Sequence, residues 1–444
     1  MTQPVDTMEK IVSLSKRRGF VFPSSEIYGG LKSCWDYGPL GVELKRNVKD
    51  AWWSAMVRNR RDILGLDASI LMHPQVWVTS GHVAGFNDPL VDCKKCKARF
   101  RADTIANEIC PEKPSKRPGD CGGELTEPRQ FNLMFRTNMG PVESSESSVY
   151  LRPETAQGIF VNFRNVVDTC RVRPPFGIAQ IGKSFRNEII TENFIFRSRE
   201  FEQMEMEFFC PPAEAEKWYA HWREERFQWF LRLGVRPANL RLRDHDKAEL
   251  SHYSRACCDI EYKFPFGWKE LEGIADRTDY DLRRHSEATG RDLTAFDEDT
   301  KEHYFPFVVE PALGVDRAVL TFLVDSYDEE QLEDGDARVV LRLHPRLAPY
   351  KAGIFPLVKK DGLPEIAERL EVELNRNWNV FYDESGAIGR RYRRQDEVGT
   401  PFGLTVDYDT LKDQTITVRE RDSMRQSRIA LDAVARFIRD QLEA

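Results

Sequence analysis

The sequence predicts an α+β fold for residues 1–345, followed by a small α/β domain over residues 346–444. Residues 149–210 are rich in β-branched and aromatic side chains between loop signals, which indicates a region built from strands. Amphipathic stretches on either side of this region indicate helices. After residue 348, apolar runs alternate with helical patterns, and this βαβ rhythm is typical of an α/β domain.

The bulk composition excludes several classes of protein. The chain has 444 residues, 41% of them hydrophobic, and a formal net charge of -7, so a nucleic-acid partner would need local basic patches. No apolar run approaches the length of a membrane span, and the first residues lack the apolar core of a signal peptide. We therefore expect a cytoplasmic protein with no membrane partner. Its 9 cysteines, an odd number, indicate free thiols or metal ligands rather than disulfides.

The first predicted helix spans residues 41–61. Its apolar side chains recur every four residues: Leu44, Val48, Trp52 and Met56. A strand pattern follows at residues 66–82 and is interrupted by Pro74. Residues 92–125 then change abruptly to a composition rich in Cys, Lys, Pro and Gly, which indicates an insertion.

Residues 177–184 read GIAQIGKS and match the pattern G-x-x-x-x-G-K-[ST], which marks a phosphate-binding loop in many nucleotide-binding proteins. Such a loop needs a flexible, glycine-rich turn whose backbone N–H groups converge on phosphate. Here the residues between the glycines are mostly apolar and period-two alternation follows, so we predict a strand and exclude this mode of binding. The run VLTFLVD at residues 319–325, which could pass for a second nucleotide motif, lies inside a helical pattern.

The predicted strand FEQMEMEFF at residues 201–209 places different side chains on its two faces. One face carries Glu202, Met204, Met206 and Phe208. The other carries Gln203, Glu205 and Glu207 between Phe201 and Phe209. The first face can pack against a core, while the second lines up an amide and two carboxylates between aromatic rings.

Arginines before this strand complement its carboxylates. The run SFRNE places Arg186 and Glu188 on a common face, and the following loop adds Arg197 and Arg199. Such a hairpin can present guanidinium groups to phosphate, and carboxylates to an ammonium group or a metal ion. The alternative is a solvated antiparallel hairpin with cross-strand ion pairs.

Two further patterns complete the larger domain. Residues 213–233 have helical periodicity inside an expected insertion at 211–250, and residues 305–327 read as a strand, a turn at Gly314 and a helix. The stretch 333–353 follows as the expected domain boundary. In the C-terminal domain we expect helices at 363–377 and 427–442, and strands in the apolar runs 352–358, 378–382, 402–406 and 414–418.

Several of these segments resemble the class II aminoacyl-tRNA synthetases, in their glycyl branch. FRNE followed by FRSREFEQMEMEFF resembles motif 2 of that class, and VVEPALGVDRAVLTFLVDSY at 308–327 resembles motif 3. The helix at 41–61, followed by a strand and Pro74, resembles motif 1, the dimer-forming element. Three more segments resemble glycyl enzymes: YGPLGVELK (37–45), LRPETAQGIF (151–160) and ELEGIADRTDYDL (270–282). So many matches, in order along nearly the whole chain, make the resemblance specific.

The resemblance implies an antiparallel β-sheet core flanked by helices, a homodimer, and attachment of glycine to the 3′ end of tRNA(Gly) through a glycyl-adenylate made from ATP. Arg186 and Arg317 are the implied catalytic residues, because cationic groups must hold the negative α-phosphate and amino-acid carboxylate together. Arg186 is expected to contact both groups, and Arg317 to cover the adenine and reach the γ-phosphate. Glu188 is expected to read the adenine edge, and Phe201 to stack on the ring.

The resemblance also implies the full sets of binding residues. Those for ATP are Arg186, Asn187, Glu188, Phe196, Arg197, Ser198, Arg199, Glu200, Phe201, Glu270, Leu271, Gly314, Val315, Asp316 and Arg317. Those for glycine are Arg101, Glu154, Phe201, Glu202, Gln203, Met204, Glu205, Glu310, Pro311, Ala312, Leu313 and Gly314. Glu270 and Glu310 are the candidate Mg²⁺ ligands, since hard carboxylate oxygens suit that ion, with a surface ion pair as the alternative for each.

Glycine has no side chain, so its pocket can grip only the ammonium and carboxylate groups. Glu154, Glu205 and Glu207 are candidates to surround the ammonium, while lack of room rejects larger amino acids. A pocket for the smallest amino acid needs no second editing site. One departure from the common family pattern is Ala312, which stands where a serine is frequent and removes a hydroxyl near the ammonium.

The insertion at 92–125 carries four cysteines. Cys93 and Cys96 have the spacing of a metal knuckle, whereas Cys110 and Cys121 are more widely separated. Four thiolates in a segment with little apolar core of its own suit a structural zinc ion. The alternatives are reduced cysteines in a solvent loop or a degenerated site. We expect the remaining cysteines to be buried thiols: Cys34, Cys170, Cys210, Cys257 and Cys258.

Residues 348–444 resemble the anticodon-binding domain of several class II synthetases. GRRYRRQDEVGTPF at 389–402 gathers arginines around Tyr392, and guanidinium groups beside an aromatic ring suit single-stranded RNA. The arginines are Arg390, Arg391, Arg393 and Arg394. The alternative is a solvated, arginine-rich start of a helix.

Two other functions stay open at the level of sequence. One is a non-catalytic, synthetase-like RNA-binding paralogue, although such proteins typically lose the arginines of motifs 2 and 3, which are present here as Arg186 and Arg317. The other is a sister class II synthetase for serine, threonine or proline. The segments RPETAQG and FEQMEMEFF favour glycine.

Overall fold

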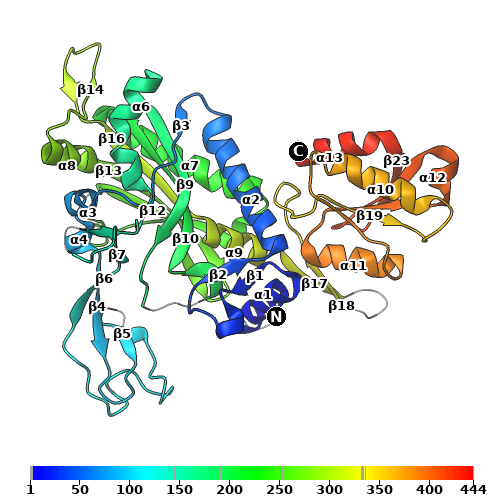
Figure 1. Ribbon diagram of the computed structural model, residues 1–444, viewed down its shortest axis with the longest axis horizontal. Helices are drawn as coiled ribbons and strands as arrows, with labels where there is room; N and C mark the ends of the chain where they lie inside the picture. The colour runs from blue at the N-terminus through cyan, green and yellow to red at the C-terminus, as the bar shows by residue number, and fades with distance from the viewer. Residues whose placement is uncertain are drawn as a thin grey trace.

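A seven-stranded sheet forms the centre of the larger part of the molecule (Figure 1). The computed structural model describes residues 4–103, 105–144, 147–189, 193–251, 254–331, 335 and 337–443. Neighbouring strands of the sheet are antiparallel, except that β3 and β9 are parallel. In sheet order the strands are β11 (Leu240–Asp244), β12 (Ala256–Phe264), β13 (Gly267–Thr278), β16 (Phe307–Gly314), β10 (Glu200–Cys210), β9 (Phe176–Phe185) and β3 (Ile63–Gly65). The predicted α+β class with an antiparallel core is confirmed.

Period-two alternation gives this sheet one apolar and one polar face. On β10, the side chains of Met204, Met206 and Phe208 are fully buried in the main hydrophobic core. Gln203 and Glu205 point the other way and line a cavity. The faces predicted for FEQMEMEFF are therefore confirmed, and GIAQIGKS lies in strand β9, as predicted, rather than in a loop.

Three helices cover the apolar face: α2 (Pro39–Trp53), α7 (Ala215–Arg232) and α9 (Val315–Ser326). Helix α2 begins with proline in its first turn, where the missing N–H costs nothing, and continues into a π-helical turn at Ser54–Arg58. All four side chains of its predicted four-residue repeat are buried. Helix α9 follows β16 directly after Gly314, as predicted. In the described parts of the chain, no helix is long and apolar enough to cross a membrane.

Two predicted strand regions are wrong in part. Pro74 begins helix α3 (Pro74–Thr79) instead of interrupting a strand, because proline suits a first helical turn and the His73 ring nitrogen accepts a hydrogen bond from the Gln75 backbone N–H at 3.1 Å. Within 149–210, residues form helices α5 (Ala156–Phe160) and α6 (Phe163–Cys170). The helical spacing of the apolar residues here is visible in the sequence, and the side chains concerned share one buried cluster: Ala156, Ile159, Phe160 and Phe163.

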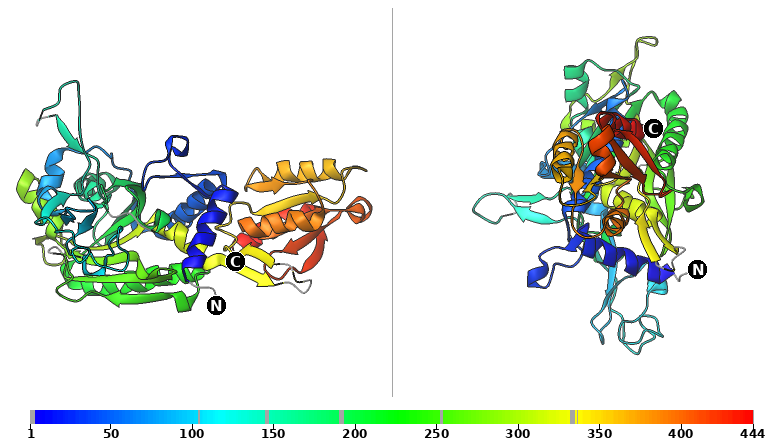
Figure 2. Two further views of the ribbon diagram at one scale, coloured as in Figure 1. Left: turned by 90° about the horizontal axis from the view of Figure 1, so that it is seen from below. Right: turned by 90° about the vertical axis from the view of Figure 1, so that its right-hand side faces the viewer.

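Smaller elements surround the sheet. The insertion and the segments on either side of it form a three-stranded sheet from β4 (Asn87–Asp92), β5 (Arg99–Arg101) and β6 (Arg129–Asn132), which projects away from the body (Figures 1 and 2). The others are α1 (Pro4–Arg18), β1 (Val21–Pro23), β2 (Trp35–Tyr37), α4 (His82–Gly85), β7 (Arg136–Asn138), β8 (Ser148–Tyr150), α8 (Tyr280–Thr289), β14 (Ala295–Phe296), β15 (His303–Tyr304), β17 (Tyr327–Gln331) and β18 (Ala337–Leu341).

The C-terminal residues build a second, five-stranded sheet with its own hydrophobic core, at one end of the molecule (Figure 2). Its strands lie in the order β20-β19-β21-β22-β23. The elements are β19 (Ala352–Pro356), α10 (Leu363–Leu374), β20 (Val380–Tyr382), α11 (Ile388–Val398), β21 (Phe402–Val406), α12 (Tyr408–Asp413), β22 (Thr415–Glu420), β23 (Gln426–Ala430) and α13 (Val434–Glu443). The helix predicted at 427–442 is thus wrong at its start, where alternating residues form edge strand β23.

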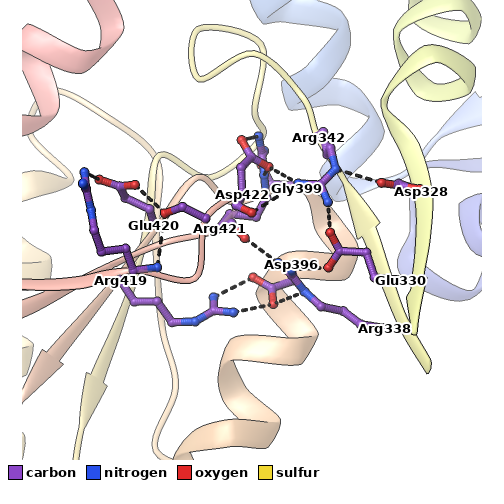
Figure 3. A network of polar contacts seen from close by, with 12 residues as sticks. Asp328, Glu330, Arg338, Arg342, Asp396, Gly399, Arg419, Glu420, Arg421 and Asp422 are labelled. Carbon is purple, nitrogen blue, oxygen red and sulfur yellow. Dashed lines mark hydrogen bonds and ion pairs between the residues drawn. The ribbon is translucent and has the colours of Figure 1, made fainter. Parts of the chain in front are cut away.

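A polar network joins the two-stranded sheet of β17 and β18 to the C-terminal domain (Figure 3). Arg338 of β18 is fully buried, and its Nε donates to Asp396 Oδ2 of α11 at 2.9 Å. Asp396 also accepts from Arg419 at 2.9 and 3.0 Å, so one carboxylate serves two arginines. Arg342 adds an ion pair with Asp422 at 3.1 Å. Of the expected boundary stretch, residues 333, 334 and 336 lie outside the described residues.

Candidate active site

A cavity of about 220 Å³ opens on the polar face of the large sheet. Alternate residues of two adjacent strands supply its floor, since side chains two apart on a strand share a face. They are Gln203 and Glu205 from β10, and Glu310, Ala312 and Gly314 from β16. Glu205 pairs with Ala312 across the two strands, so the cavity lies directly over this pairing.

Most of the site residues expected from the sequence meet in this cavity. Its walls and floor contain Glu154, Arg186, Glu188, Phe196, Arg197, Ser198, Phe201, Gln203, Glu205, Glu270, Leu271, Glu310, Ala312, Gly314, Asp316 and Arg317. They come from segments far apart in the chain, which the sheet brings together. The lining also contains Ile195 and Arg277, which the sequence did not single out.

Arg186 lies between two aromatic rings at one side of the cavity. Its guanidinium carbon is 5.3 Å from the ring centres of both Phe86 and Phe201. Its Nε donates to the Pro153 carbonyl oxygen at 3.0 Å. These contacts fix the side chain while leaving the rest of the guanidinium fork directed at the cavity, where it can bind an oxyanion.

Arg317, in the first turn of α9, also lines the cavity. Its guanidinium lies 4.6 Å from the ring centre of Phe196, and its Nη1 is 3.2 Å from Glu270 Oε2. The positive charge of Arg317 is the main cause that lowers the pKa of Glu270. Glu270 therefore stays a carboxylate, and half of its side chain is exposed.

Glu188 and Asp316 are two buried acidic residues of the cavity lining. Arg197 Nη1 lies 3.8 Å from Glu188 Oε2. Asp316, in the first turn of α9, accepts from Lys45 Nζ at 3.1 Å and from the backbone N–H of Glu202 at 3.0 Å. Asp316 thus ties helix α9 to strand β10.

Carboxylates crowd the inner end of the cavity. Glu154 Oε2 lies 3.3 Å from His82 Nε2, and Glu154 Oε1 accepts from Gln157 Nε2 at 3.2 Å. Burial acts to raise the pKa of Glu154, but His82, Arg277 and Arg186 together lower it. Glu154 is therefore ionised.

Glu205 lies beside Glu154 and is almost completely buried. It accepts from the Thr155 backbone N–H at 2.8 Å, from the Thr155 hydroxyl, and from Gln203 Nε2 at 2.6 Å. Burial and the charge of Glu154 raise its pKa, while the Thr155 contacts oppose the rise. The donors hold Glu205 in one orientation.

Arg277 is the main residue that sequence reasoning missed. Its Nη1 donates to Glu310 Oε2 at 2.6 Å, and its Nε donates to Asp281 Oδ2 at 2.9 Å. It occupies a bulge of β13, between Asp276 and Thr278 in the pairing with β16. Only its place inside the family-like segment ELEGIADRTDYDL pointed to it. Burial nevertheless raises the pKa of Glu310 to about 8.

Glu207 lies below the cavity and does not line it. Its side chain is fully buried, and neither carboxyl oxygen has a hydrogen-bond partner among the described residues. Burial and then the charge of Glu310 raise the pKa of Glu207 far above its usual value. Glu207 is therefore a neutral carboxylic acid, unlike the ammonium ligand that the sequence suggested.

Several residues expected in the two binding sets lie outside the cavity lining. Five of them lie on the apolar side of their strands or in the core: Glu202, Met204, Pro311, Leu313 and Val315. Arg199 donates to the carbonyl oxygens of Glu188 and Lys32, and Glu200 pairs with Lys183. Asn187 contributes a backbone hydrogen bond to Leu133, and Arg101 pairs with Asp88 at 3.0 Å in the projecting insertion.

The four insertion cysteines form one cluster of free thiols with a small apolar core. Cys93, Cys110 and Cys121 are buried, and Cys96 is half-buried. Backbone N–H groups first, then the thiols of Cys96 and Cys121, lower the pKa of Cys93. A Cβ on Gly123 would clash with Cys93 Sγ at 2.4 Å and touch Cys121 Sγ at 3.6 Å, so glycine is required there. Elsewhere, Cys170 is exposed and was wrongly expected to be buried.

The arginine-rich segment of α11 divides into two kinds of residue. Arg391 donates to the carbonyl oxygens of Pro356 and Gly386, and Arg394 pairs with Asp383 at 2.5 Å. The Tyr392 hydroxyl bonds to Thr405 Oγ1, so this ring faces the domain's own sheet rather than solvent. Of the four arginines of this segment, Arg390 and Arg393 remain available to another molecule within the described part of the chain, and both line a shallow groove.

Comparison with known proteins agrees with both halves of the fold. The profile of the tRNA synthetase class II core domain (G, H, P, S and T) matches residues 135–327, and that of the anticodon binding domain matches residues 351–441. A glycine–tRNA ligase of Alkaliphilus oremlandii is 54% identical over 466 residues, covering 98% of this chain and 99% of the relative. Those of Borreliella burgdorferi and Treponema denticola are each 55% identical, covering 97% and 94% of their own lengths and 98% and 95% of this chain. The chain therefore belongs to the glycine–tRNA ligase family of class II tRNA synthetases.

Proposed function

We propose that this protein attaches glycine to the 3′ end of tRNA(Gly), using ATP and Mg²⁺ and passing through a glycyl-adenylate. The observation that carries the proposal is one small cavity lined by arginines and by carboxylates from distant segments of the chain. The names of the relatives support glycine as the substrate and give no support to a non-catalytic paralogue or to a sister synthetase.

The first reaction joins two anions, since the glycine carboxylate attacks the α-phosphorus of ATP and pyrophosphate leaves. Arg186 is suited to hold both anions, because two aromatic rings and a carbonyl fix its position. A preorganised guanidinium needs no reorganisation as charge develops in the transition state. Arg317 and Arg197 are suited to the outer phosphates, and Phe201 and Glu188 to the adenine.

The inner carboxylates are suited to the glycine ammonium group. Glu154 is ionised, Glu205 is held by Thr155 and Gln203, and Glu310 is held by Arg277. Ala312, in the floor of the cavity, has no hydroxyl. Carboxylate oxygens therefore accept the hydrogen bond from the ammonium group that a serine hydroxyl would accept at this position. A side chain on the substrate would have to displace closely packed groups, and such overpacking typically costs about 1–3 kcal/mol.

The proposal includes two kinds of metal ion. Glu270, ionised and half-exposed beside Arg317, would hold Mg²⁺ together with phosphate oxygens, and the ion would neutralise phosphate charge. Glu310, whose Oε2 accepts from Arg277, is the second candidate ligand, and binding of the ion there would displace a proton because its pKa is raised to about 8. The thiols of Cys93, Cys96, Cys110 and Cys121, which belong to one small cluster, would be the ligands of a structural zinc ion that braces the insertion.

We further propose domain limits of 1–345 and 346–444, with tRNA contacted by the C-terminal domain through Arg390 and Arg393, and the cytoplasm as the location. A homodimer is supported by apolar side chains exposed before α2, where Ile27 and Tyr28 are 89% and 87% exposed. Exposed apolar patches mark interaction surfaces. Measuring the molecular mass by analytical ultracentrifugation, at high and low protein concentration, tests the dimer.

The decisive measurement is amino-acid-dependent exchange of pyrophosphate into ATP. We expect exchange with glycine and none with alanine, serine or proline. Exchange with no amino acid would leave only the paralogue, and exchange with another amino acid would identify a sister enzyme. In Arg186→Gln we expect exchange to fall by at least about 100-fold with unchanged circular dichroism, as for loss of an oxyanion ligand. Unchanged exchange would refute the role of Arg186.

A further inference from the structure

A second group of metal-binding side chains lies on the cavity side of the large sheet, away from the cavity lining. His245 follows β11, and Cys257 and Asp259 lie two residues apart on the neighbouring strand β12, so both point to one face. One ligand atom from each residue lies within 4.8 Å of those of the other two. The neighbouring side chain of Cys258 points to the opposite face and belongs to the main core.

The backbone holds these three residues in place. The His245 backbone N–H donates to the Cys257 carbonyl oxygen at 2.9 Å, which continues the pairing of β11 with β12. His245 Nε2 lies 2.8 Å from Asp259 Oδ2. The side chains of His245 and Asp259 are 20% and 9% exposed, so an ion can reach them while most of the surrounding water is excluded. Because these side chains already lie close together, a bound ion would have to order them only slightly.

The chemistry of the set suits a zinc-like ion. An imidazole, a thiolate and a carboxylate are the ligand types that bind Zn²⁺, and three protein ligands leave a fourth position for water. Arg243 lies 3.9 Å from Asp259 Oδ2 and would oppose a cation. Its guanidinium is nevertheless shared with Glu249 at 3.1 Å and Glu261 at 3.2 Å, so acidic groups outnumber it.

The group lies close to the cavity. Asp259 pairs with Gly273, which pairs in turn with Ala312 of the cavity floor. A Cβ on Gly273 would lie 4.0 Å from Asp259 Oδ1 and 3.9 Å from Glu270 Oε1. The carboxylate that we assign to Mg²⁺–ATP and the carboxylate of this group therefore border the same space.

We propose that His245, Cys257 and Asp259 form a binding site for a divalent ion of the zinc class, distinct from both the insertion cysteines and the Mg²⁺ position. The competing explanation is a plain ion pair between His245 and Asp259, with Cys257 as a bystander. The two explanations differ in the number of ions that the protein holds and in whether sulfur is a ligand.

The test counts metal ions in the full-length protein after removal of metal with a chelator and titration with Co²⁺. Bound ions are counted by mass spectrometry after desalting, and the sulfur-to-cobalt charge-transfer absorption is recorded. In both Cys257→Ser and His245→Gln, we expect one ion fewer per chain than in the wild type, with weaker absorption for Cys257→Ser. The control Cys170→Ser removes an exposed thiol of α6 that belongs to neither cluster, and it should bind as the wild type does.

Equal ion counts in Cys257→Ser and the wild type would overturn the proposal. So would a loss in Cys257→Ser that His245→Gln does not share, because the site needs both ligands. Circular dichroism of each variant checks the fold, and the two variants replace residues on different strands. Because the readout is metal content, its result is independent of whether glycine is the substrate.

Discussion

Replacing the buried acid Glu207 by glutamine should change how stability depends on pH. The free energy of unfolding changes with pH in proportion to the difference in bound protons between the unfolded and folded states. Glu207 has an ordinary pKa of 4.5 when unfolded, and burial raises it well above that in the folded protein. Between these two values the folded state holds one proton more, so the stability of the wild type falls as pH rises.

The size of this effect follows from the linkage relation. One proton corresponds to about 1.4 kcal/mol per pH unit, so this is the most by which Glu207 can lower the stability of the wild type for each pH unit between its unfolded and folded pKa values. Glutamine does not titrate, and the variant lacks this slope. The amide adds unpartnered donors and a penalty of about 1–3 kcal/mol, but that penalty does not depend on pH. Glu310 titrates as well, and because its charge interacts with Glu207, the difference between the two proteins reports the titration of this pair.

Urea unfolding of Glu207→Gln and the wild type, at one protein concentration and several pH values, measures this difference. We expect the stability of the variant relative to the wild type to rise with pH above 4.5, with a slope of up to about 1.4 kcal/mol per pH unit. The control Glu216→Gln, at an exposed position of α7, should give curves parallel to the wild type. Parallel curves for Glu207→Gln as well would refute the neutral buried acid.

Three further substitutions test other parts of the structure. Arg277→Gln should lower kcat/KM for glycine by about 10²–10³-fold in the exchange assay, because Glu310 loses its buried partner, whereas an equal rise in the KM for ATP would contradict that role. Asp396→Asn should destabilise the protein by about 3–5 kcal/mol, since two buried arginines lose one carboxylate, while Asp440→Asn in an exposed pair should change stability by less than about 0.5 kcal/mol. Gly41→Ala should lower the melting temperature, because a Cβ would lie 1.8 Å from the Phe20 carbonyl oxygen, whereas Gly389→Ala in α11 meets nothing within 4 Å and should not.

Local patterns predicted the elements whose signal is periodic and strong. The four-residue repeat of α2 and the two-residue repeat of β10 are buried as expected, because each repeat has only one arrangement that removes its apolar side from water. The same alternation correctly sent Gln203 and Glu205 to the cavity. The same alternation also predicts that Met204 and Glu202 point away from the cavity. We nevertheless placed both residues in the glycine-binding set, because the segment resembles motif 2.

The errors came from signals with two physical meanings. A proline can end a strand or open a helix, and Pro74 opens one. Aromatic and β-branched residues suggested strands at 149–210, although their spacing from Ala156 to Phe163 is helical. At Arg391 and Tyr392, composition alone did not separate side chains that bind RNA from those that bind their own domain.

The amino-acid sequence by itself determined the class of fold, the family and the set of charged side chains from which a glycine- and ATP-binding site can be built. Only the tertiary structure decided which of those charges are paired, which are buried and which are neutral. Arg277 reaches Glu310 through a bulge in β13, and Glu207 loses its charge beneath the cavity, because both outcomes depend on neighbours from other strands. Desolvation and pairing act through space, and no spacing along the chain records them.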